Sequence, residues 1–439
     1  MNSTFGPKAR RILGHHITVA LLIFVVALAL RLVYVSSTVI DSPIRADAAK
    51  YAMIAVNLVS NNTYTHEQSE TPDAFITPGY PLFLAAVLAV KQDLNSTYDF
   101  VLRTQAVLMA LTAVIVFLLC LQFLPRWAAI TGGLLTAFAP HMVTISGYML
   151  TEGLFTFIVC LSIYLVALGT RRESLVLLLV GAFFIGIGAL VRPSYLLFPL
   201  VVAVVIMLDK RLLVSRRLIF ASLAVIVVAV VWSPWAIWKA DKESSVDSAA
   251  ASFALGSYPD LIHENPQNRG YPYLDDPQYE AMTKDMDVAL DTAIGRARQE
   301  PGKYAHWYLI GKPVTFWSWN NLASGERGPF IYPVTSSIYS SSGFFMFTLS
   351  LFQAIHPIFL LLSLAAAIFL LRDLAISRFN TAANTEAYFI VGCIAYFTVV
   401  HMVFAPLPRY SIPMHPLIYM IGLFFISKLL ELKSQASQE

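Results

Sequence analysis

Ten apolar runs, most of them long enough to cross a bilayer, alternate with short polar joints along the chain. They cover residues 15–36, 100–124, 128–146, 152–169, 175–191, 193–208, 217–238, 343–371, 386–405 and 410–428. A spanning helix needs about 20 predominantly apolar residues. The pattern therefore predicts an all-α polytopic membrane protein with about ten transmembrane helices.

The positions of Lys and Arg predict the orientation, because cytoplasmic joints carry an excess of both residues. With the N-terminus inside, the basic joints all fall on the cytoplasmic side: Arg126, Arg171, Arg172, Lys210, Arg211, Arg216, Arg217, Arg372, Arg378, Lys428 and Lys433. This parity requires the short apolar stretch 80–90 to lie in the interface or re-enter instead of crossing. We expect both termini to be cytoplasmic.

Two long polar regions then fall outside the cytoplasm, a first outer loop at 37–99 and a second at 239–342. They divide the chain into a catalytic transmembrane module (1–238), a large outer loop (239–342) and C-terminal transmembrane helices (343–439). We expect both loops to contain interfacial helices.

Inside the large loop, the spacing of apolar residues predicts a helix over 276–300 that ends at Pro301 and Gly302. The following segment, 304–319, is rich in Tyr and Trp, which concentrate at membrane–water interfaces. We expect this segment to lie along the headgroup layer.

Composition agrees with a membrane protein and excludes several other classes. The 439 residues are 57% hydrophobic and 13% charged, whereas soluble domains carry about 25% charged residues. The net charge of +3, without any basic–aromatic stripe, argues against a nucleic-acid partner. The chain has no phosphate-cradling Gly-rich motif, and its nine histidines are scattered without metal-ligand spacing. We predict no cofactor; a divalent metal is not excluded, but nothing signals one.

The outer ends of the predicted spans carry ionisable residues that need an explanation. The cations are Arg45, Lys50, Lys91, Arg103, Arg192 and Arg409, and the carboxylates include Asp41, Asp47 and Glu152. Charge at membrane depth is costly and indicates a functional site by default. Arginine grips phosphate through its flat fork of donors, and a carboxylate can take a proton from a hydroxyl. This set of residues suits a lipid-linked phosphate ester.

Each of these residues also has a structural interpretation. Asp47 and Glu152 can cap helices, where the macrodipole favours acidic groups. Arg192 precedes Pro193 at a helix end, and Arg103 can snorkel to the headgroups. Arg31, inside the first span, can be the structural partner of a carboxylate.

Two motifs resemble the first outer loop of polyprenyl-phosphate-sugar glycosyltransferases of superfamily C (GT-C), which include protein O-mannosyltransferases and lipid A aminoarabinose transferases. They are R-A-D-A-A-K-Y-A-M-I-A-V-N-L (45–58) and T-P-G-Y-P-L-F-L-A (77–85). Similar stretches follow in order: L-R-T-Q-A-V-L (102–108), M-L-T-E-G-L-F (149–155), A-L-V-R-P-S-Y (189–195), S-P-W (233–235) and P-R-Y-S-I-P-M-H-P (408–416). The resemblance covers most of the chain, and residues 239–342 match least.

The resemblance implies that Asp47 is the catalytic general base and that Glu152 is the second catalytic carboxylate. It implies a sugar donor on polyprenyl phosphate, inversion at the anomeric carbon, and a lipid, glycan or protein acceptor. Five cations are expected at the donor phosphate, Arg45, Lys50, Arg103, Arg192 and Arg409, and Tyr51, Tyr80 and Tyr410 at the substrates. We expect a bacterial inner-membrane protein with its active site outside, in contact with membrane lipids.

The chain departs from its relatives at three points. The Lys-Pro-Pro-Leu sequence of aminoarabinose transferases is replaced by P-G-Y-P-L (78–82), so their phosphate-binding Lys has no counterpart. Trp238 and Lys239 replace an Arg-Asn pair after the seventh span. The Asp-x-Glu metal motif of oligosaccharyltransferases is absent near Glu152.

Other functions remain as alternatives. A transporter or flippase of a lipid-linked substrate would be expected to carry charges near the middle of several spans and to show two matching halves, and the sequence shows neither. Two further alternatives are a non-catalytic membrane scaffold with a degraded site and a polymerase or ligase of lipid-linked glycans.

Overall fold

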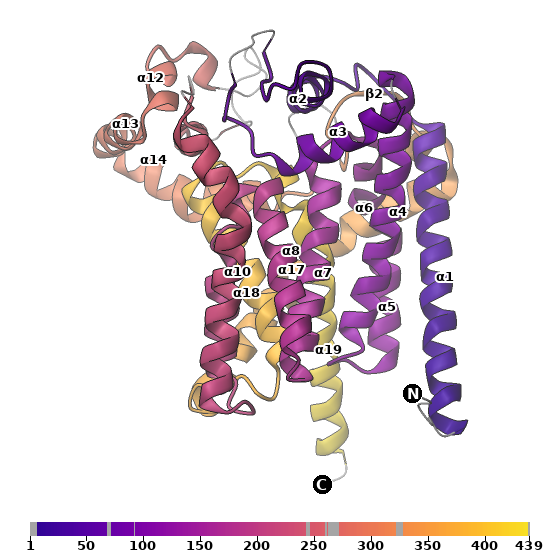
Figure 1. The fold of residues 1–439 in the computed structure, drawn as a ribbon. Helices are drawn as coiled ribbons and strands as arrows, with labels where there is room; N and C mark the ends of the chain where they lie inside the picture. The colour runs from indigo at the N-terminus through magenta and orange to yellow at the C-terminus, as the bar shows by residue number, and fades with distance from the viewer. Residues whose placement is uncertain are drawn as a thin grey trace.

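Long helices form a bundle whose one end is covered by short helices (Figure 1). The computed structural model describes residues 7–67, 72–91, 93–242, 246–259, 261, 272–321 and 328–437. Both ends of the described chain lie at the uncovered end of the bundle. We call the covered end the loop face and the other end the terminal face.

The bundle contains seven described segments that are long and apolar enough to cross a membrane. They contain α1 (Pro7–Ser37), α4 (Leu94–Cys120), α7 (Thr151–Arg171), α10 (Val214–Ala240), α17 (Gly343–Ile376), α18 (Thr385–Val403) and α19 (His415–Ala436). An eighth arises if α5 (Arg126–Phe138) and α6 (Pro140–Thr144) form one bent span. With the shorter apolar helices α8 (Leu175–Val191) and α9 (Phe198–Leu208), every predicted run coincides with a helix or a helix pair. The predicted fold class is confirmed.

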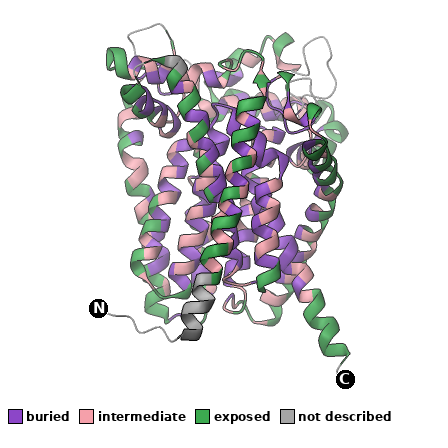
Figure 2. Ribbon diagram, turned by 90° about the vertical axis from the view of Figure 1, so that its right-hand side faces the viewer, coloured by how far each residue is buried: buried purple, intermediate pink, exposed green. Residues whose placement is uncertain are grey.

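The outer surface of the bundle is apolar, as expected for helices that face lipid. Large exposed hydrophobic side chains include Leu21 and Val25 on α1, Val230 on α10 and Leu361 on α17. Figure 2 shows these exposed stripes along helices whose inner sides are buried. The three cysteines, Cys120, Cys160 and Cys393, are buried and unpaired, so they serve as small packing residues.

Arg31 binds the backbone at the break between α5 and α6, where the chain bends by 56°. Pro140 has no backbone N–H, so the last carbonyls of α5 lose helical partners. The buried Arg31 guanidinium donates to the carbonyl oxygens of Thr136 and Ala137, each at 3.1 Å. The expected carboxylate partner is thus replaced by backbone carbonyls.

The first loop-face region contains β1 (Val39–Ile40), α2 (Asp47–Asn61) and α3 (Gly79–Lys91). β1 pairs antiparallel with β2 (Val334–Ser336), which joins the two outer regions. The 13 residues of α3 span about 20 Å, less than the roughly 30 Å of a hydrocarbon core. Figure 1 shows α3 at the loop face, as the parity argument requires.

Short helices also build the second region. These are α11 (Ser248–Gly256), η3 (Pro272–Asp275), α12 (Tyr279–Lys284), α13 (Met286–Gln299), α14 (Pro301–His306), the π-helical turn η4 (Trp307–Gly311), α15 (Lys312–Phe316) and α16 (Ile338–Ser341). The helix predicted over 276–300 is interrupted at Asp285, whose carboxylate accepts from the N–H of Asp287 and caps α13. Pro301 begins α14 instead of only ending its predecessor, because proline suits the first helical turn. Residues 243–245, 260, 262–271 and 322–327 of the predicted loop lie outside the described residues.

Three 3₁₀ turns complete the described elements near the loop face. They are η1 (Ile145–Gly147), η2 (Pro193–Tyr195) and η6 (Pro408–Met414). Because η6 leads directly into α19, it carries Arg409 at the top of a buried helix.

Candidate functional site

Two carboxylates and two guanidinium groups meet at the loop face. Arg409 Nη2 forms an ion pair with Asp47 Oδ2. Its Nε lies 3.8 Å from Glu152 Oε1, and Arg192 Nη2 lies 3.2 Å from the same oxygen. Arg409 therefore bridges both carboxylates. We call Asp47, Glu152, Arg192 and Arg409 the charge cluster.

The two carboxylates differ in their access to solvent. The side chain of Glu152 is 2% exposed, whereas that of Asp47 is 36% exposed. A substrate hydroxyl can reach Asp47, while Glu152 is enclosed by its partners. The arrangement leaves Asp47 accessible and makes Glu152 a shared partner of both guanidinium groups.

Asp47 is the first residue of α2, and a strained residue precedes it. Ala46 has a φ of 48° and a ψ of −122°, a region that residues with a Cβ seldom occupy. Such a conformation costs about 1–3 kcal/mol and persists only where the surroundings impose it. The strained turn directs the first carboxylate of α2 toward Arg409.

Glu152 and Arg192 are brought together by the meeting of α7 and α8. Glu152 lies in the first turn of α7, and Arg192 directly follows the last residue of α8. Gly79 at the start of α3 packs against this end of α8: a Cβ added there would lie 2.7 Å from the carbonyl carbon of Leu190. Only glycine allows this approach, which explains the glycine of the P-G-Y-P motif.

Tyr410 packs against both guanidinium groups. Its ring centroid lies 4.5 Å from the Arg192 guanidinium carbon and 5.2 Å from that of Arg409. Cation–π contacts hold guanidinium groups in place without consuming their N–H donors. Those donors stay available for an anion.

Two further cations extend the charge cluster on the α2 side. The Lys50 ammonium lies 5.0 Å from the Phe75 ring centroid. The Arg45 guanidinium lies 4.7 Å from the ring of Tyr332, whose hydroxyl donates to the Arg45 carbonyl at 3.1 Å. Both cations thus rest on aromatic rings beside the turn that carries Asp47.

The electrostatics keep Asp47 ionised. Burial raises the pKa of this carboxyl, but the guanidinium of Arg409, helped by Lys50 and Arg192, outweighs burial and holds the pKa below its usual range. The pKa of the Tyr51 hydroxyl is raised well above its usual value, first by burial and then by the charge of Asp47. Tyr51 is therefore a neutral hydroxyl beside an anionic carboxylate.

A line of aromatic residues connects the charge cluster to the interior. The rings of Tyr51 and Tyr80 meet edge to face with centroids 5.2 Å apart. Tyr80 donates to Gln105 Oε1 at 3.0 Å, and Gln105 Nε2 donates to the Tyr148 carbonyl at 2.8 Å. Gln105 and Tyr80 belong to two different motifs of the sequence, and this contact explains why both occur.

Arg103 is the one predicted phosphate ligand that the structure does not bring to the charge cluster. Its side chain is exposed on α4, and among the described residues no ion pair or hydrogen bond joins it to Asp47 or Glu152. Neighbouring Gln105, two positions along the helix, points inward instead. Residues two positions apart lie on different sides of a helix. The motif alone does not show which of the two sides faces inward.

Sequence reasoning missed Tyr332 and Lys312. Tyr332 carries no local signal, because only folding brings the second outer region against Arg45. Lys312 is buried, and its ammonium donates to the carbonyls of Met402, Val403 and Phe404 at 2.8, 3.2 and 3.3 Å. The pattern of the predicted interfacial segment drew attention to its aromatic residues. It gave no indication that Lys312 binds backbone carbonyls.

Three of the scattered histidines come together inside the bundle. The ring of His415 lies 4.7 Å from that of His141 and 5.3 Å from that of His356. Throughout the described parts of the chain, no group of three or more His, Cys, Asp or Glu residues is arranged to hold a metal ion.

Comparison with known proteins identifies the architecture. Residues 76–238 match the family described as dolichyl-phosphate-mannose-protein mannosyltransferase. The archaeal oligosaccharyltransferase AglB from Archaeoglobus fulgidus, solved with an inhibitory peptide and a dolichol-phosphate, superimposes with a TM-score of 0.54 at 12% identity. The match covers 96% of this chain and 51% of AglB. The chain has the GT-C fold.

Two further structures extend the comparison of this GT-C chain. The same oligosaccharyltransferase tethered to an acceptor peptide gives a TM-score of 0.53 at 13% identity, covering 95% of this chain and 50% of that one. ArnT from Cupriavidus metallidurans bound to undecaprenyl phosphate gives 0.49 at 13% identity, covering 95% and 60%. This GT-C chain therefore spans about half the length of AglB. No curated protein matches its sequence significantly.

The family match and the charge cluster overlap in part. The matched region 76–238 contains Tyr80, Glu152 and Arg192, but not Asp47 or Arg409. The family match therefore covers the first three of these residues. Asp47 and Arg409 belong to the charge cluster because of the ion pair that they form.

Proposed function

We propose that this GT-C protein is a glycosyltransferase that moves a sugar from a polyprenyl phosphate to a hydroxyl of a lipid, glycan or protein acceptor, with inversion. One observation carries the proposal: Arg409 contacts both Asp47 and Glu152 at the loop face of a membrane protein. A proton acceptor and phosphate-binding groups thus belong to a single cluster.

The charge of the site suits a departing lipid phosphate. Lys50, Arg192 and Arg409 act on the Asp47 carboxyl, and together with Asp47 and Glu152 these described residues carry a net charge of +1. A sugar-linked phosphate carries one negative charge, and a released phosphate monoester carries about 1.5 to 2 at neutral pH. Cations that meet charge developing in the transition state accelerate the chemical step.

Asp47 is the proposed general base. Its carboxylate takes the proton of the acceptor hydroxyl while the hydroxyl oxygen bonds to the anomeric carbon. The bond between that carbon and the phosphate oxygen breaks, and its electron pair leaves with the phosphate. Attack on the face opposite the phosphate inverts the anomeric centre.

Donor binding would strengthen this base. The donor phosphate competes with Asp47 for Arg409, whose charge holds the pKa of that carboxyl down. As Arg409 turns toward phosphate, the pKa of Asp47 rises and the carboxylate becomes a better proton acceptor. Glu152 keeps Arg192 and Arg409 in place during the exchange.

The known proteins support the donor class. AglB was solved with a dolichol-phosphate, and the matching family is described by dolichyl-phosphate-mannose. Mannose is therefore the first sugar to test. The exposed apolar side chains of the bundle offer the polyprenyl tail a lipid-facing surface.

The deciding experiment supplies the purified protein in vesicles with radiolabelled polyprenyl-phosphate sugars and a membrane extract as the source of acceptors. Label should leave the lipid phosphate and appear on an acceptor. A transporter would move the intact donor across the membrane, and that result would replace the proposal.

We further propose a bacterial inner membrane, cytoplasmic termini and a loop face outside the cytoplasm. Both described ends lie at the terminal face, and the native cysteines are buried. A cysteine introduced at exposed Asp287 should react with an impermeant reagent in intact cells. Reaction only after lysis would reverse the orientation.

A further inference from the structure

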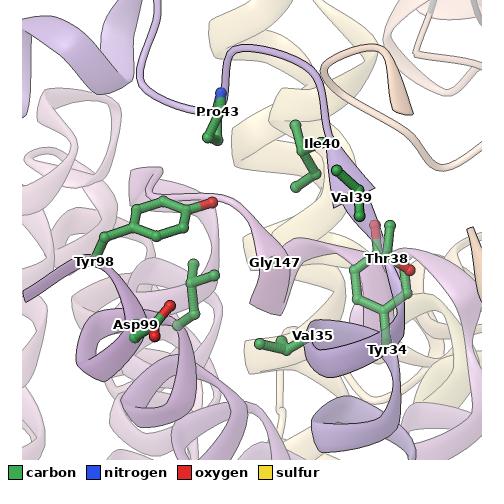
Figure 3. Close-up of a pocket in the computed structure, with 10 residues that line it drawn as sticks. Tyr34, Val35, Thr38, Val39, Ile40, Pro43, Tyr98, Asp99 and Gly147 are labelled. Atoms are coloured by element: carbon green, nitrogen blue, oxygen red, sulfur yellow. The ribbon is translucent and has the colours of Figure 1, made fainter. Parts of the chain in front are cut away.

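A cavity of about 260 Å³ lies at the loop face between α1 and α4. Tyr34, Thr38, Tyr98 and Asp99 give its wall polar groups, and Val35, Ile40, Pro43 and Leu102 give it apolar surface. Figure 3 shows Tyr98 and Asp99 on one side of the space, with Thr38 and Tyr34 on the other. The cavity is large enough to hold several water molecules.

One hydroxyl in this wall lacks a partner among the described residues. The hydroxyl oxygen of Thr38 is buried and makes no hydrogen bond in the described chain, whereas the buried Tyr34 hydroxyl meets that of Tyr148. The Tyr148 hydroxyl also donates to the Tyr332 carbonyl and accepts from the Ile331 N–H. An unpaired buried hydroxyl is costly, and Thr38 borders the cavity.

The lining selects a neutral, hydroxyl-rich ring. None of the described residues that line the cavity is a cation, and Asp99 would repel a phosphate or carboxylate. A carboxylate accepts hydrogen bonds from two hydroxyls at once, and the Tyr98 ring offers a flat apolar face. A sugar ring has both a hydroxyl-rich edge and an apolar C–H face.

The chain leads directly from the cavity wall to the proposed base. Pro43 in its wall precedes Asp47 by four residues, at most about 14 Å of extended chain. Ser42 and Ala46, on either side of that short segment, both have positive φ, 47° and 48°.

We propose that this cavity is a recognition subsite for one sugar ring of the acceptor, remote from the hydroxyl that reacts. The inference rests on the proposed function. A sugar ring bound in the cavity holds the acceptor at a fixed position relative to Asp47, because the strained segment 42–46 connects the cavity wall to Asp47. Such a site lets binding energy from a non-reacting part of the substrate orient the reacting part.

Binding of free glycosides tests the subsite without turnover. The full chain in nanodiscs is mixed with methyl α-mannopyranoside, methyl α-glucopyranoside and methyl β-galactopyranoside, and saturation-transfer NMR measures binding. At least one should bind, and Asp99→Asn should weaken it about tenfold by replacing a charged acceptor with a neutral amide. Leu102→Trp, which fills the cavity, should abolish it. Asp241→Asn, an exposed carboxylate at the end of α10, is the matched control.

Turnover separates this inference from the proposed function. Asp99→Asn should raise the KM for acceptor about tenfold and leave the KM for donor unchanged. If no glycoside binds, or if Asp99→Asn and Leu102→Trp bind like the wild type, the subsite is wrong even when transfer proceeds. Displacement of the bound glycoside by the sugar-bearing polyprenyl phosphate, but not by undecaprenyl phosphate alone, would assign the cavity to the donor and overturn it. Absence of any transfer would instead overturn the proposed function.

Discussion

Arg409 and Asp47 form an ion pair across 362 positions of sequence. The pair joins the turn before the last helix to the first residue of α2, so opposite ends of the chain close one site. Arg409 also approaches Glu152, which belongs to a third element. A single guanidinium therefore holds together the three segments that the proposed reaction needs.

Asp47→Asn should abolish sugar transfer while donor binding persists. The amide keeps the size of the side chain but cannot accept a proton, and general-base catalysis contributes about 10²–10⁴ in rate. The measurement is single-turnover transfer beside donor binding on the same preparation. Asp41→Asn, an exposed carboxylate of the same outer segment, should transfer normally. Undiminished turnover in Asp47→Asn would remove this carboxylate from catalysis.

Arg192→Ala and Arg409→Ala should each weaken binding of a polyprenyl-phosphate sugar. Hydrogen bonds to a charged group contribute about 1.5–3 kcal/mol, which corresponds to roughly 10–150-fold in Kd. Titration with undecaprenyl phosphate gives the affinities directly. Arg103→Ala is the matched control, because exposed Arg103 lies outside the charge cluster. Equal losses in all three variants would mean that no phosphate site is centred on Arg192 and Arg409.

The sequence predicted the bundle well because hydrophobic length is a local property. Each apolar run became a helix or helix pair, and α3 lay at the loop face as its short length required. Local sequence does not encode which side of a helix faces inward at a given residue. Arg103 and Gln105 share one motif, yet Gln105 is fully buried and Arg103 is exposed.

Contacts between distant segments were also beyond a reading of motifs. Tyr332 meets Arg45 only after the large loop folds back, and His141, His356 and His415 meet from three separate elements. No spacing rule predicts such contacts. The residues of the charge cluster could be predicted because charge is costly at membrane depth. Which carboxylate pairs with which arginine could be seen only in the folded structure.

The acid side of the pH profile should report Asp47. Its pKa is lowered in the folded protein, so its ion pair stabilises the fold above the ordinary pKa of aspartate. That stability, together with activity, is lost as pH falls through the lowered pKa. Lys50→Met removes one of the cations that lower it, so the acid limb of kcat/KM should move to higher pH.

Lys91→Met provides the control for this shift. Lys91 lies on the ring of Phe100, 4.5 Å from its centroid, and is not among the groups that act on the Asp47 carboxyl. Its profile should overlay that of the wild type. An acid limb that stays fixed in Lys50→Met would show that another group controls the rate at low pH.

Lys312→Met should destabilise the protein and also weaken donor binding. The Lys312 ammonium donates to Met402, Val403 and Phe404, the last carbonyls of α18, which have no partner within the helix. Leaving such groups unpaired in a buried place costs about 1–3 kcal/mol. Arg409 follows Phe404 by five residues, so a loosened helix end shifts the guanidinium that binds phosphate.

Two measurements on matched variants separate these effects of Lys312. Lys303→Met removes an exposed lysine of the same loop, whose pair with Glu300 at 3.5 Å lies on the surface and contributes at most about 1 kcal/mol. Lys303→Met should keep both the midpoint of thermal unfolding and the KM for donor. Lys312→Met should lower the midpoint of thermal unfolding and raise the KM for donor. If unfolding shifts while the KM for donor stays constant, Lys312 supports the fold without positioning Arg409, because the turn at η6 then holds that guanidinium unaided.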